Sequence, residues 1–146
     1  MTLENLARIG RLLPHTATRE EIGKLLAGAA RSLKDARNPT NSNASKLTLA
    51  YTAIMEAAQA ALFANGLRPS KSEGGHHMTM VQSLVHTIGI EPARMRVLDM
   101  IRHKRNVVDY SGEDIEPSDA REAIAAAKAL LADVKAWLAK NHPELS

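Results

Sequence analysis

Apolar residues recur with the period of an α-helix along almost the whole chain, and no segment alternates in the way a β-strand does. Residues three and four positions apart share one face of a helix, so each such stripe marks the side that a helix buries. Two clear stripes begin at Ile22 and at Ala120. A chain of this kind folds by packing helix against helix, and we expect no β-sheet.

Local signals place the ends of the expected helices. Thr18, with Glu21 three residues later, forms a capping box before the first long helix. Gly66 is expected to end the second helix as a left-handed cap, and Pro92 to open the fourth in its first turn. Between these two helices we expect a polar loop over residues 67–75 and then one short helix.

The whole chain, residues 1–146, is expected to form one domain, because its length suits one hydrophobic core and no repeat or boundary interrupts it. The core should cover about residues 18–140, with residues 1–17 as an N-terminal arm or short helix. The last helix has the near-3.5 spacing of antiparallel bundles. We therefore predict an all-α fold, an up-and-down helical bundle of four long helices plus one short helix.

Composition excludes several classes of protein. The chain has no cysteine, which rules out disulfides, thiol catalysis and thiolate metal sites. Glu4, Arg8 and Arg11 interrupt the first apolar residues, so the N-terminus lacks the core of a secretory signal. No apolar run approaches the ~18 residues that cross a bilayer. We expect a cytoplasmic protein without a membrane segment.

Charge is unevenly distributed, although the net charge is only +3. Residues 94–105 contain five Lys or Arg against one Asp, and residues 113–122 contain five acidic residues against one Arg. The two segments either neutralise each other as solvated neighbours, or the basic one forms a groove for phosphates. The four aromatic residues are too few for a surface on which RNA bases stack.

The densest polar pattern is the stretch RHKRNVVDY at residues 102–110. At 100° per residue its polar side chains follow one another along the edge of the helix's apolar face. Spacings of three and four residues also allow ion pairs along this row. The row, with its flanking aspartate, consists of Asp99, Arg102, Arg105, Asn106, Asp109 and Tyr110. Charges at the edge of a core indicate an interface or a site.

With this helix order and the motif Arg-x-x-Arg-Asn-x-x-Asp-Tyr, the chain resembles the HEPN superfamily. These are small helical-bundle proteins, often dimeric, found in toxin–antitoxin and defence modules and beside nucleotidyltransferases. The resemblance covers roughly residues 20–140 and includes ASKLTLAY at 44–51 and EGGHH at 73–77. The motif looks like the subgroup whose signature ends in Asp-Tyr. The resemblance implies a homodimer and a connection with RNA or nucleotides.

Ribonucleases of this family use an arginine followed, after four to six residues, by a histidine, and need no metal. Arg105 matches the arginine and Asn106 the polar residue after it, but Tyr110 stands where the histidine would be. Tyrosine titrates near ~10 and histidine near ~6.5, and a general base contributes roughly 10²–10⁴ in rate. The departure argues against ribonuclease activity. Any activity is expected to be that of a metal-independent endoribonuclease, with Arg105 and Tyr110 as catalytic residues and no cofactor.

Three interpretations of the row remain open. In the first, Arg102 and Arg105 hold phosphates of RNA or a nucleotide in a cleft at a dimer seam. In the second, Asp99–Arg102 and Arg105–Asp109 ion pairs fix the register of the homodimer. In the third, the row contacts a cognate nucleotidyltransferase or antitoxin. The favoured function is a homodimeric component of a toxin–antitoxin or defence-like module; the alternative is a non-catalytic interaction or dimerisation domain with a structural row.

The histidines are interpreted as solvated side chains and not as a metal site. His76 and His77 are adjacent and point in different directions, and no carboxylate lies at a supporting spacing beside them or His86. The resemblance allows His77 to reach the dimer cleft, because family members share a histidine in that loop. No metal ligand is predicted.

Overall fold

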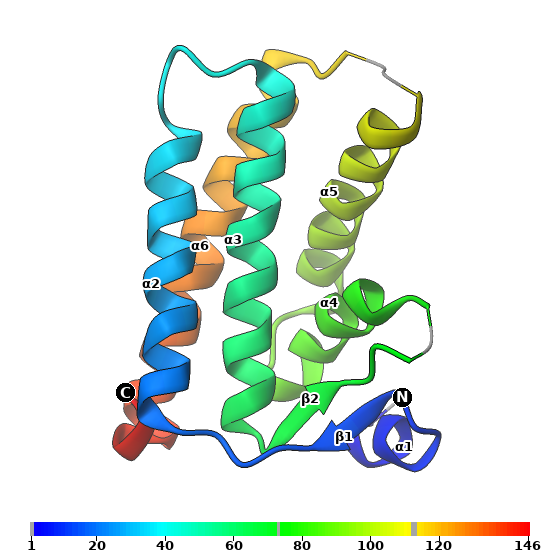
Figure 1. The fold of residues 1–146 in the computed structure, drawn as a ribbon, viewed down its shortest axis with the longest axis vertical. Helices are drawn as coiled ribbons and strands as arrows, with labels where there is room; N and C mark the ends of the chain where they lie inside the picture. The colour runs from blue at the N-terminus through cyan, green and yellow to red at the C-terminus, as the bar shows by residue number, and fades with distance from the viewer. Residues whose placement is uncertain (1, 73, 112–113) are drawn as a thin grey trace.

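The protein is a bundle of α-helices with a two-stranded sheet at one end (Figure 1). The computed structural model describes residues 2–72, 74–111 and 114–146, apart from the side chains of residues 109–111. The elements are, in order, α1 (Leu3–Arg8), β1 (Leu12–Pro14), α2 (Arg19–Ala36), α3 (Asn43–Ala64), β2 (Leu67–Pro69), α4 (His76–Thr87), α5 (Pro92–Ser111), α6 (Pro117–Asn141) and a 3-10 turn (Pro143–Leu145). The predicted helical fold class is confirmed.

The helix ends lie close to the positions that local signals indicate. The Thr18 side chain accepts a hydrogen bond from the backbone N–H of Glu21 at 3.1 Å and so caps α2. Gly66 follows α3 with a φ of 77°, a left-handed conformation that favours glycine. Pro92 is the first residue of α5. Capping chemistry depends on near neighbours in the chain, which is why it can be read from sequence.

Helix α3 is the centre of the bundle. It packs against α2 and α6 on one side and against α4 and α5 on the other (Figure 1). By length and composition α3 could cross a membrane, which corrects the expectation that no apolar run is long enough. However, 72% of its apolar window is buried inside the bundle, as expected for a core helix.

Small side chains let the neighbouring helices approach α3 closely. Its fully buried alanines are Ala50, Ala53, Ala57, Ala58, Ala60 and Ala61. Residues of α6 such as Leu130 and Val134 are also completely buried. This contact between α3 and its neighbours forms the largest part of the hydrophobic core.

The small sheet is a correction to the purely helical prediction. β1 and β2 pair antiparallel, with Leu12 opposite Pro69 and Pro14 opposite Leu67. Each strand has three residues, too few to show an alternating pattern, and their pairing is a long-range contact. β2 also occupies the beginning of the segment that we expected to be a loop.

The N-terminal arm is therefore a short helix followed by a strand. Leu6 and Leu12 are buried against the core, which attaches the arm to the bundle. The Ser70 N–H donates to the carbonyl of Arg11 at 2.9 Å, just beyond β2. The arm thus supports the start of the segment that leads from β2 into α4.

Helix α5 contacts both α3 and α4 more extensively than it contacts α6. Ion pairs also reach across to α6: Lys104 Nζ lies 2.7 Å from Asp119 Oδ1, and Arg94 pairs with Asp133. The outer side of α5 exposes apolar side chains: Met100 is 57% exposed, Val107 44% and Val97 37%. A helix with one apolar side left in solvent is a candidate contact surface.

Candidate functional site

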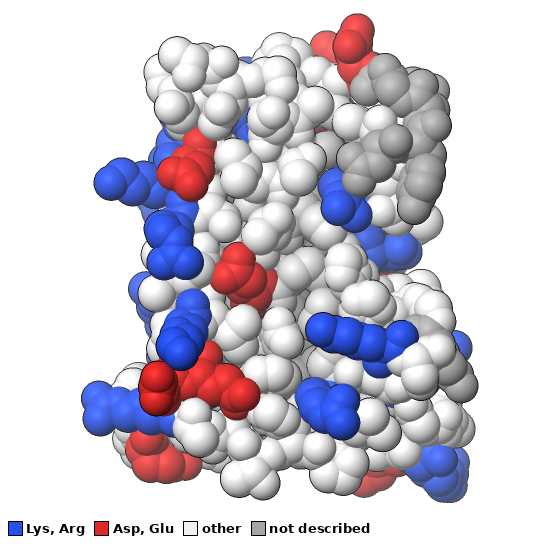
Figure 2. Space-filling view, viewed as in Figure 1, with Lys and Arg blue, Asp and Glu red and all other residues white. Residues whose placement is uncertain are grey.

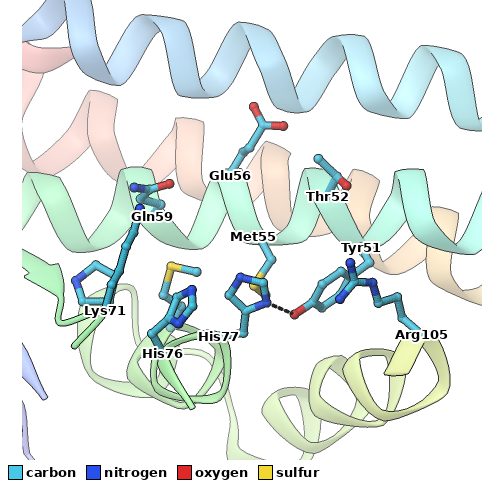
Figure 3. A pocket seen from close by; sticks show the side chains of 11 residues that line it. Tyr51, Thr52, Met55, Glu56, Gln59, Lys71, His76, His77 and Arg105 are labelled. Carbon is cyan, nitrogen blue, oxygen red and sulfur yellow. Dashed lines mark hydrogen bonds between the residues drawn. The ribbon is translucent and has the colours of Figure 1, made fainter. Parts of the chain in front are cut away.

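The polar row of α5 divides into two parts in the structure. Arg102 turns back to its own helix, where its Nε donates to Asp99 Oδ1 at 2.8 Å. Its side chain is 13% exposed, so this predicted ion pair is well shielded from water. Arg105 instead points toward α3 and lines a pocket there (Figure 3).

The Arg105 side chain lies over an aromatic ring. Its guanidinium carbon is 5.3 Å from the centre of the Tyr51 ring, a cation–π contact between α5 and α3. Tyr51 is 3% exposed and belongs to the buried side of α3. The ring therefore holds the arginine at a defined place next to the core.

The Tyr51 hydroxyl is bonded to a histidine of a third helix. Tyr51 Oη and His77 Nδ1 are 2.9 Å apart, which joins α3 to the first turn of α4. Gly75, with a φ of 83°, precedes this turn and lets the chain enter α4 with the histidine facing inward. The expectation that His77 is a solvated loop residue is therefore wrong.

Together these side chains form one end of a pocket of about 250 Å³. Figure 3 shows Arg105 at one end, Lys71 and His76 toward the other, and His77 beside Tyr51 between them. The complete lining is Tyr51, Thr52, Met55, Glu56, Gln59, Pro69, Lys71, His76, His77, Met80 and Arg105. The lining combines cationic groups, hydrogen-bonding groups and apolar surface, which suits a ligand with an anionic part.

Tyr51 is held in its neutral form. Burial raises its pKa to about 12, although the positive charges of Arg105 and Arg102 act in the opposite direction. The hydroxyl therefore keeps its proton at neutral pH, and Tyr51 serves as a hydrogen-bonding partner for His77 rather than as a base.

His77 is also held neutral. Burial lowers the pKa of its imidazole below the ordinary value of 6.5, and the nearby positive charges of His76, Arg105, Arg102 and Lys71 lower it further. At neutral pH the ring therefore has one nitrogen that carries a proton and one that can accept a proton.

Glu56 is the one carboxylate in the lining of this pocket, and it extends toward α2 in Figure 3. Burial raises its pKa, while Arg31 and a hydrogen bond from Ser32 lower it. In Figure 3 the Glu56 carboxylate is directed away from Arg105 and Lys71.

Other predicted residues of the row stand apart from this pocket. Asn106 is half-buried on α5 but does not belong to the lining. The side chains of Asp109 and Tyr110 lie outside the described residues, and so does the predicted Arg105–Asp109 ion pair. His103 adds a second partner to Asp99, with Nε2 3.6 Å from Oδ2.

Sequence reasoning missed Tyr51 as a member of the site, and it gave His77 only as a residue that the resemblance allows to reach a dimer cleft. Tyr51 falls on the apolar stripe of α3, where it reads as a core residue, and no local pattern connects it with His77. The two are 26 residues apart, and neither signal predicts their contact. A tyrosine in an alanine-rich buried stripe was the available hint, because its hydroxyl needs a partner.

A metal centre finds no support in the described parts of the chain. Within residues 2–72, 74–111 and 114–146, no three His, Asp or Glu side chains gather in a way that could hold an ion. The chemistry available at the pocket is that of a guanidinium, an ammonium and imidazoles, which bind anions and transfer protons.

The sequence model of the HEPN domain family matches residues 22–137, which is most of the chain and includes α2 to α6 almost completely. The chain therefore belongs to the HEPN domain family. This membership agrees with the helical architecture and indicates a domain related to nucleotides or RNA. A search of curated proteins finds no match.

Proposed function

We propose that this HEPN protein binds RNA or a nucleotide through phosphate groups in the pocket at Arg105. The observation that carries the proposal is the Arg105 guanidinium, placed over the Tyr51 ring at one end of a pocket that also contains Lys71. A guanidinium donates two parallel hydrogen bonds to a phosphate, and an ammonium adds charge. The family to which the chain belongs supports this class of ligand.

The surface around the pocket is favourable for a polyanion. Figure 2 shows Lys and Arg side chains over the α4 and α5 side of the molecule, separated from a second group over α2 by a mainly uncharged strip along α3. Positive side chains around a pocket raise the local concentration of anionic ligands and accelerate their association.

The pocket lies within one protomer, between α3, α4 and the β2–α4 segment, with α5 closing one end. The homodimer that we propose uses the outer side of α5, where Val97, Met100 and Val107 are exposed. At 100° per residue these three lie within about 80° of one another, and Met100 and Val107 lie about 140–160° around α5 from Arg105. Pairing of two such sides buries the exposed apolar surface and leaves each pocket complete.

A binding experiment tests the proposal. The full chain is titrated into a fluorescein-labelled single-stranded RNA in EDTA, and anisotropy gives the Kd. Arg105→Gln should raise the Kd about tenfold, equivalent to ~1.4 kcal/mol, and should reduce the salt dependence of binding by about one phosphate contact.

Arg96→Gln is the matched control, because Arg96 is an exposed arginine of the same helix and does not line the pocket. It should change the Kd by less than about twofold. Equal losses in both variants would show a diffuse charge effect and not a site at Arg105. Wild-type protein that leaves the anisotropy unchanged at micromolar concentration would remove the proposal.

The exposed side of α5 also favours a second function, that of an interaction domain without chemistry. In that case Met100→Glu disrupts assembly, while Arg105→Gln has no effect on any partner. Sedimentation velocity at micromolar concentration measures this directly. We expect a dimer for wild type and for Arg105→Gln, and a monomer for Met100→Glu; a monomeric wild type contradicts the dimer.

We further propose a cytoplasmic toxin–antitoxin or defence-like module as the setting, with a cognate antitoxin or nucleotidyltransferase as partner. What supports this is the family membership. We predict that induced expression of the protein slows the growth of a bacterial host. Arg105→Gln should restore the growth rate more than Arg96→Gln does.

A further inference from the structure

A second pocket lies at the end of the bundle where α2 ends and where α3 and α6 begin, at the top of Figure 1. It has a volume of about 320 Å³, and its described lining residues all differ from those of the pocket at Arg105. Three of them are cationic and come from three helices: Arg37 at the C-terminal cap of α2, Lys46 near the start of α3 and Arg121 near the start of α6. The pocket therefore receives positive charge from three directions.

The positive charges of this pocket lack counter-charges within residues 2–72, 74–111 and 114–146. In these parts of the chain the side chains of Arg37, Lys46 and Arg121 form no hydrogen bond or ion pair, and the lining includes no carboxylate. Asp119, in the first turn of α6, is instead paired with Lys104 at 2.7 Å. Because Arg37 and Arg121 are exposed, the charges are open to a ligand that approaches from solvent.

Lys46 and Arg121 occupy positions that disfavour cations in the absence of a ligand. The dipole of a helix places partial positive charge at its N-terminus, where acidic side chains are favourable and basic ones are not. Helical side chains also tilt toward the N-terminus, so these two long side chains lean back over the starts of α3 and α6. An anion between the two helix starts would remove this repulsion.

The arrangement of the three cations suits a phosphate group. A guanidinium donates two parallel hydrogen bonds to phosphate oxygens, and an ammonium adds a point charge. A tetrahedral phosphate presents oxygens in several directions and can meet donors from three helices at once, whereas a carboxylate has two oxygens in one plane. The chemistry of the cationic part therefore favours phosphate over carboxylate.

The rest of the lining is mainly apolar. Ala36 and Ala120 are buried at the pocket, and Ile124 is half-buried beside them. Pro117, the first residue of α6, adds apolar surface at the edge. Pockets that combine a few charged groups with apolar surface bind ligands with both kinds of part. The ligand class indicated is a small phosphorylated molecule with an apolar portion.

We propose that this pocket is a separate binding site for a phosphate monoester, with Arg37, Lys46 and Arg121 holding the phosphate and Ile124 contacting the apolar part of the ligand. The site is independent of the proposed RNA binding at Arg105, because the two pockets are formed by different residues. Either site can exist without the other.

A titration of the full chain followed by ¹H–¹⁵N NMR tests the proposal at the level of the site. The probes are inorganic phosphate, phenyl phosphate and benzoate at constant ionic strength. The amide signals of Ala36, Ala120 and Ile124 report on this pocket, and that of Tyr51 reports on the pocket at Arg105. Phenyl phosphate should bind about tenfold more tightly than inorganic phosphate, because its ring covers apolar surface. It should also bind at least about tenfold more tightly than benzoate, which has the same ring and a planar carboxylate.

Two outcomes of this titration overturn the proposal. If on the order of 10 mM phosphate or phenyl phosphate leaves the three signals unmoved, the pocket is not a phosphate site. If benzoate binds as tightly as phenyl phosphate, the pocket takes anions in general and the phosphate assignment is wrong.

Substitution of the cations identifies the groups that bind. Arg121→Gln and Lys46→Gln should each raise the Kd for phenyl phosphate about tenfold. Lys128→Gln is the matched control, because Lys128 is an exposed cation of α6 outside the lining, and it should change the Kd by less than about twofold. Arg105→Gln should likewise leave the Kd measured at Ala120 unchanged. An equal loss in Lys128→Gln would show a diffuse charge effect and contradict a site.

Thermal unfolding separates a binding role of the cations from a structural one. In phosphate-free buffer Lys46→Gln and Arg121→Gln should have a Tm equal to or above that of wild type, since each removes a cation from a helix start. Phenyl phosphate should raise the Tm of wild type and have little effect on the Lys46→Gln/Arg121→Gln double variant. A lower Tm of the single variants in phosphate-free buffer would assign the cations a structural role and overturn the proposal.

Ile124→Ala tests the apolar part of the site. The variant should bind inorganic phosphate with the wild-type Kd, which also shows that the pocket is folded. Its preference for phenyl phosphate over inorganic phosphate should fall by about threefold, because less apolar surface meets the ring. An unchanged preference would contradict the placement of the apolar part of the ligand on Ile124.

Discussion

The two sides of α3 are built differently. On the side of α2 and α6, alanines and fully buried aliphatic residues such as Leu130 make an apolar contact that extends along most of the helix. On the side of α4 and α5, Tyr51 places a hydroxyl among hydrogen-bonding and charged groups, and a pocket of about 250 Å³ remains open. One helix thus contributes both to the most closely packed part of the molecule and to its candidate site.

The difference shows how this small bundle combines stability with binding. Alanine-rich contacts bring the helix backbones close and bury apolar area, which supplies the free energy of folding. The side of α4 and α5 buries less apolar area and instead carries polar side chains that can contact a ligand. Stability and function are therefore expected to respond to different substitutions.

The largest expected change in the free energy of unfolding comes from truncating one buried leucine on each side of α3. Leu130 on α6 is 0% exposed and Leu98 on α5 is 1% exposed. Leucine-to-alanine changes in cores lower the free energy of unfolding by roughly 2–5 kcal/mol, depending on how far the cavity collapses. We expect Leu130→Ala near the top of this range and Leu98→Ala near the bottom, because α5 is less tightly held and can move inward. Urea denaturation measures both, and equal losses would contradict the comparison.

Two glycines of α2 give a smaller effect that tests the closeness of the α2 side. A Cβ at Gly28 meets the carboxylate of Glu56, whereas a Cβ at Gly23 meets no atom within 4 Å. Gly28→Ala should lower the free energy of unfolding by about 1 kcal/mol through crowding. Gly23→Ala should raise it by about 0.5–1 kcal/mol, because alanine favours a helix.

The Glu56→Ala background supplies the control for this pair. With the carboxylate removed, Gly28→Ala should become neutral or stabilising, and Gly23→Ala should keep its effect. Persistent destabilisation in that background would mean that the backbone of α3, and not the Glu56 side chain, limits the approach of α2.

The smallest effect is a pH dependence with opposite signs on the two sides of α3. Because the folded state lowers the pKa of His77, stability is full above about pH 6.5 and decreases as pH falls toward the folded value. Because it raises the pKa of Glu56, stability is full below the ordinary value of 4.5 and decreases as pH rises through the folded value. The free energy of unfolding is measured from pH 4 to 8. In His77→Asn it should no longer decrease toward low pH through His77, and in Glu56→Gln it should no longer decrease toward high pH through Glu56. Unchanged curves would show that neither group is perturbed.

Much of the fold could be predicted from sequence because helices are local. The stripe that begins at Ile22, the cap at Thr18 and the stop at Gly66 all depend on residues within a few positions. The β1–β2 pair could not, since three-residue strands have no period and pair across more than 50 residues of chain. The burial of most of the apolar window of α3 is likewise a property of the tertiary structure.

Only part of the candidate site could be predicted from the sequence. The motif on α5 indicated the arginines, and Arg105 does line the pocket. Tyr110 lies outside the described side chains, so its predicted role stays a prediction. The partners of Arg105 belong to α3 and to the start of α4, and no spacing along the chain connects them.

By itself, then, the sequence determined that this protein is a bundle of helices and that its charged row on α5 borders the core, because helical period and side-chain polarity act over a few residues. The tertiary structure decided which groups meet. Packing of α4 and α5 on α3 placed the His77 imidazole against the Tyr51 hydroxyl and the Arg105 guanidinium over its ring. Such contacts depend on the angles and distances between helices, which burial of the whole core sets and no local pattern specifies.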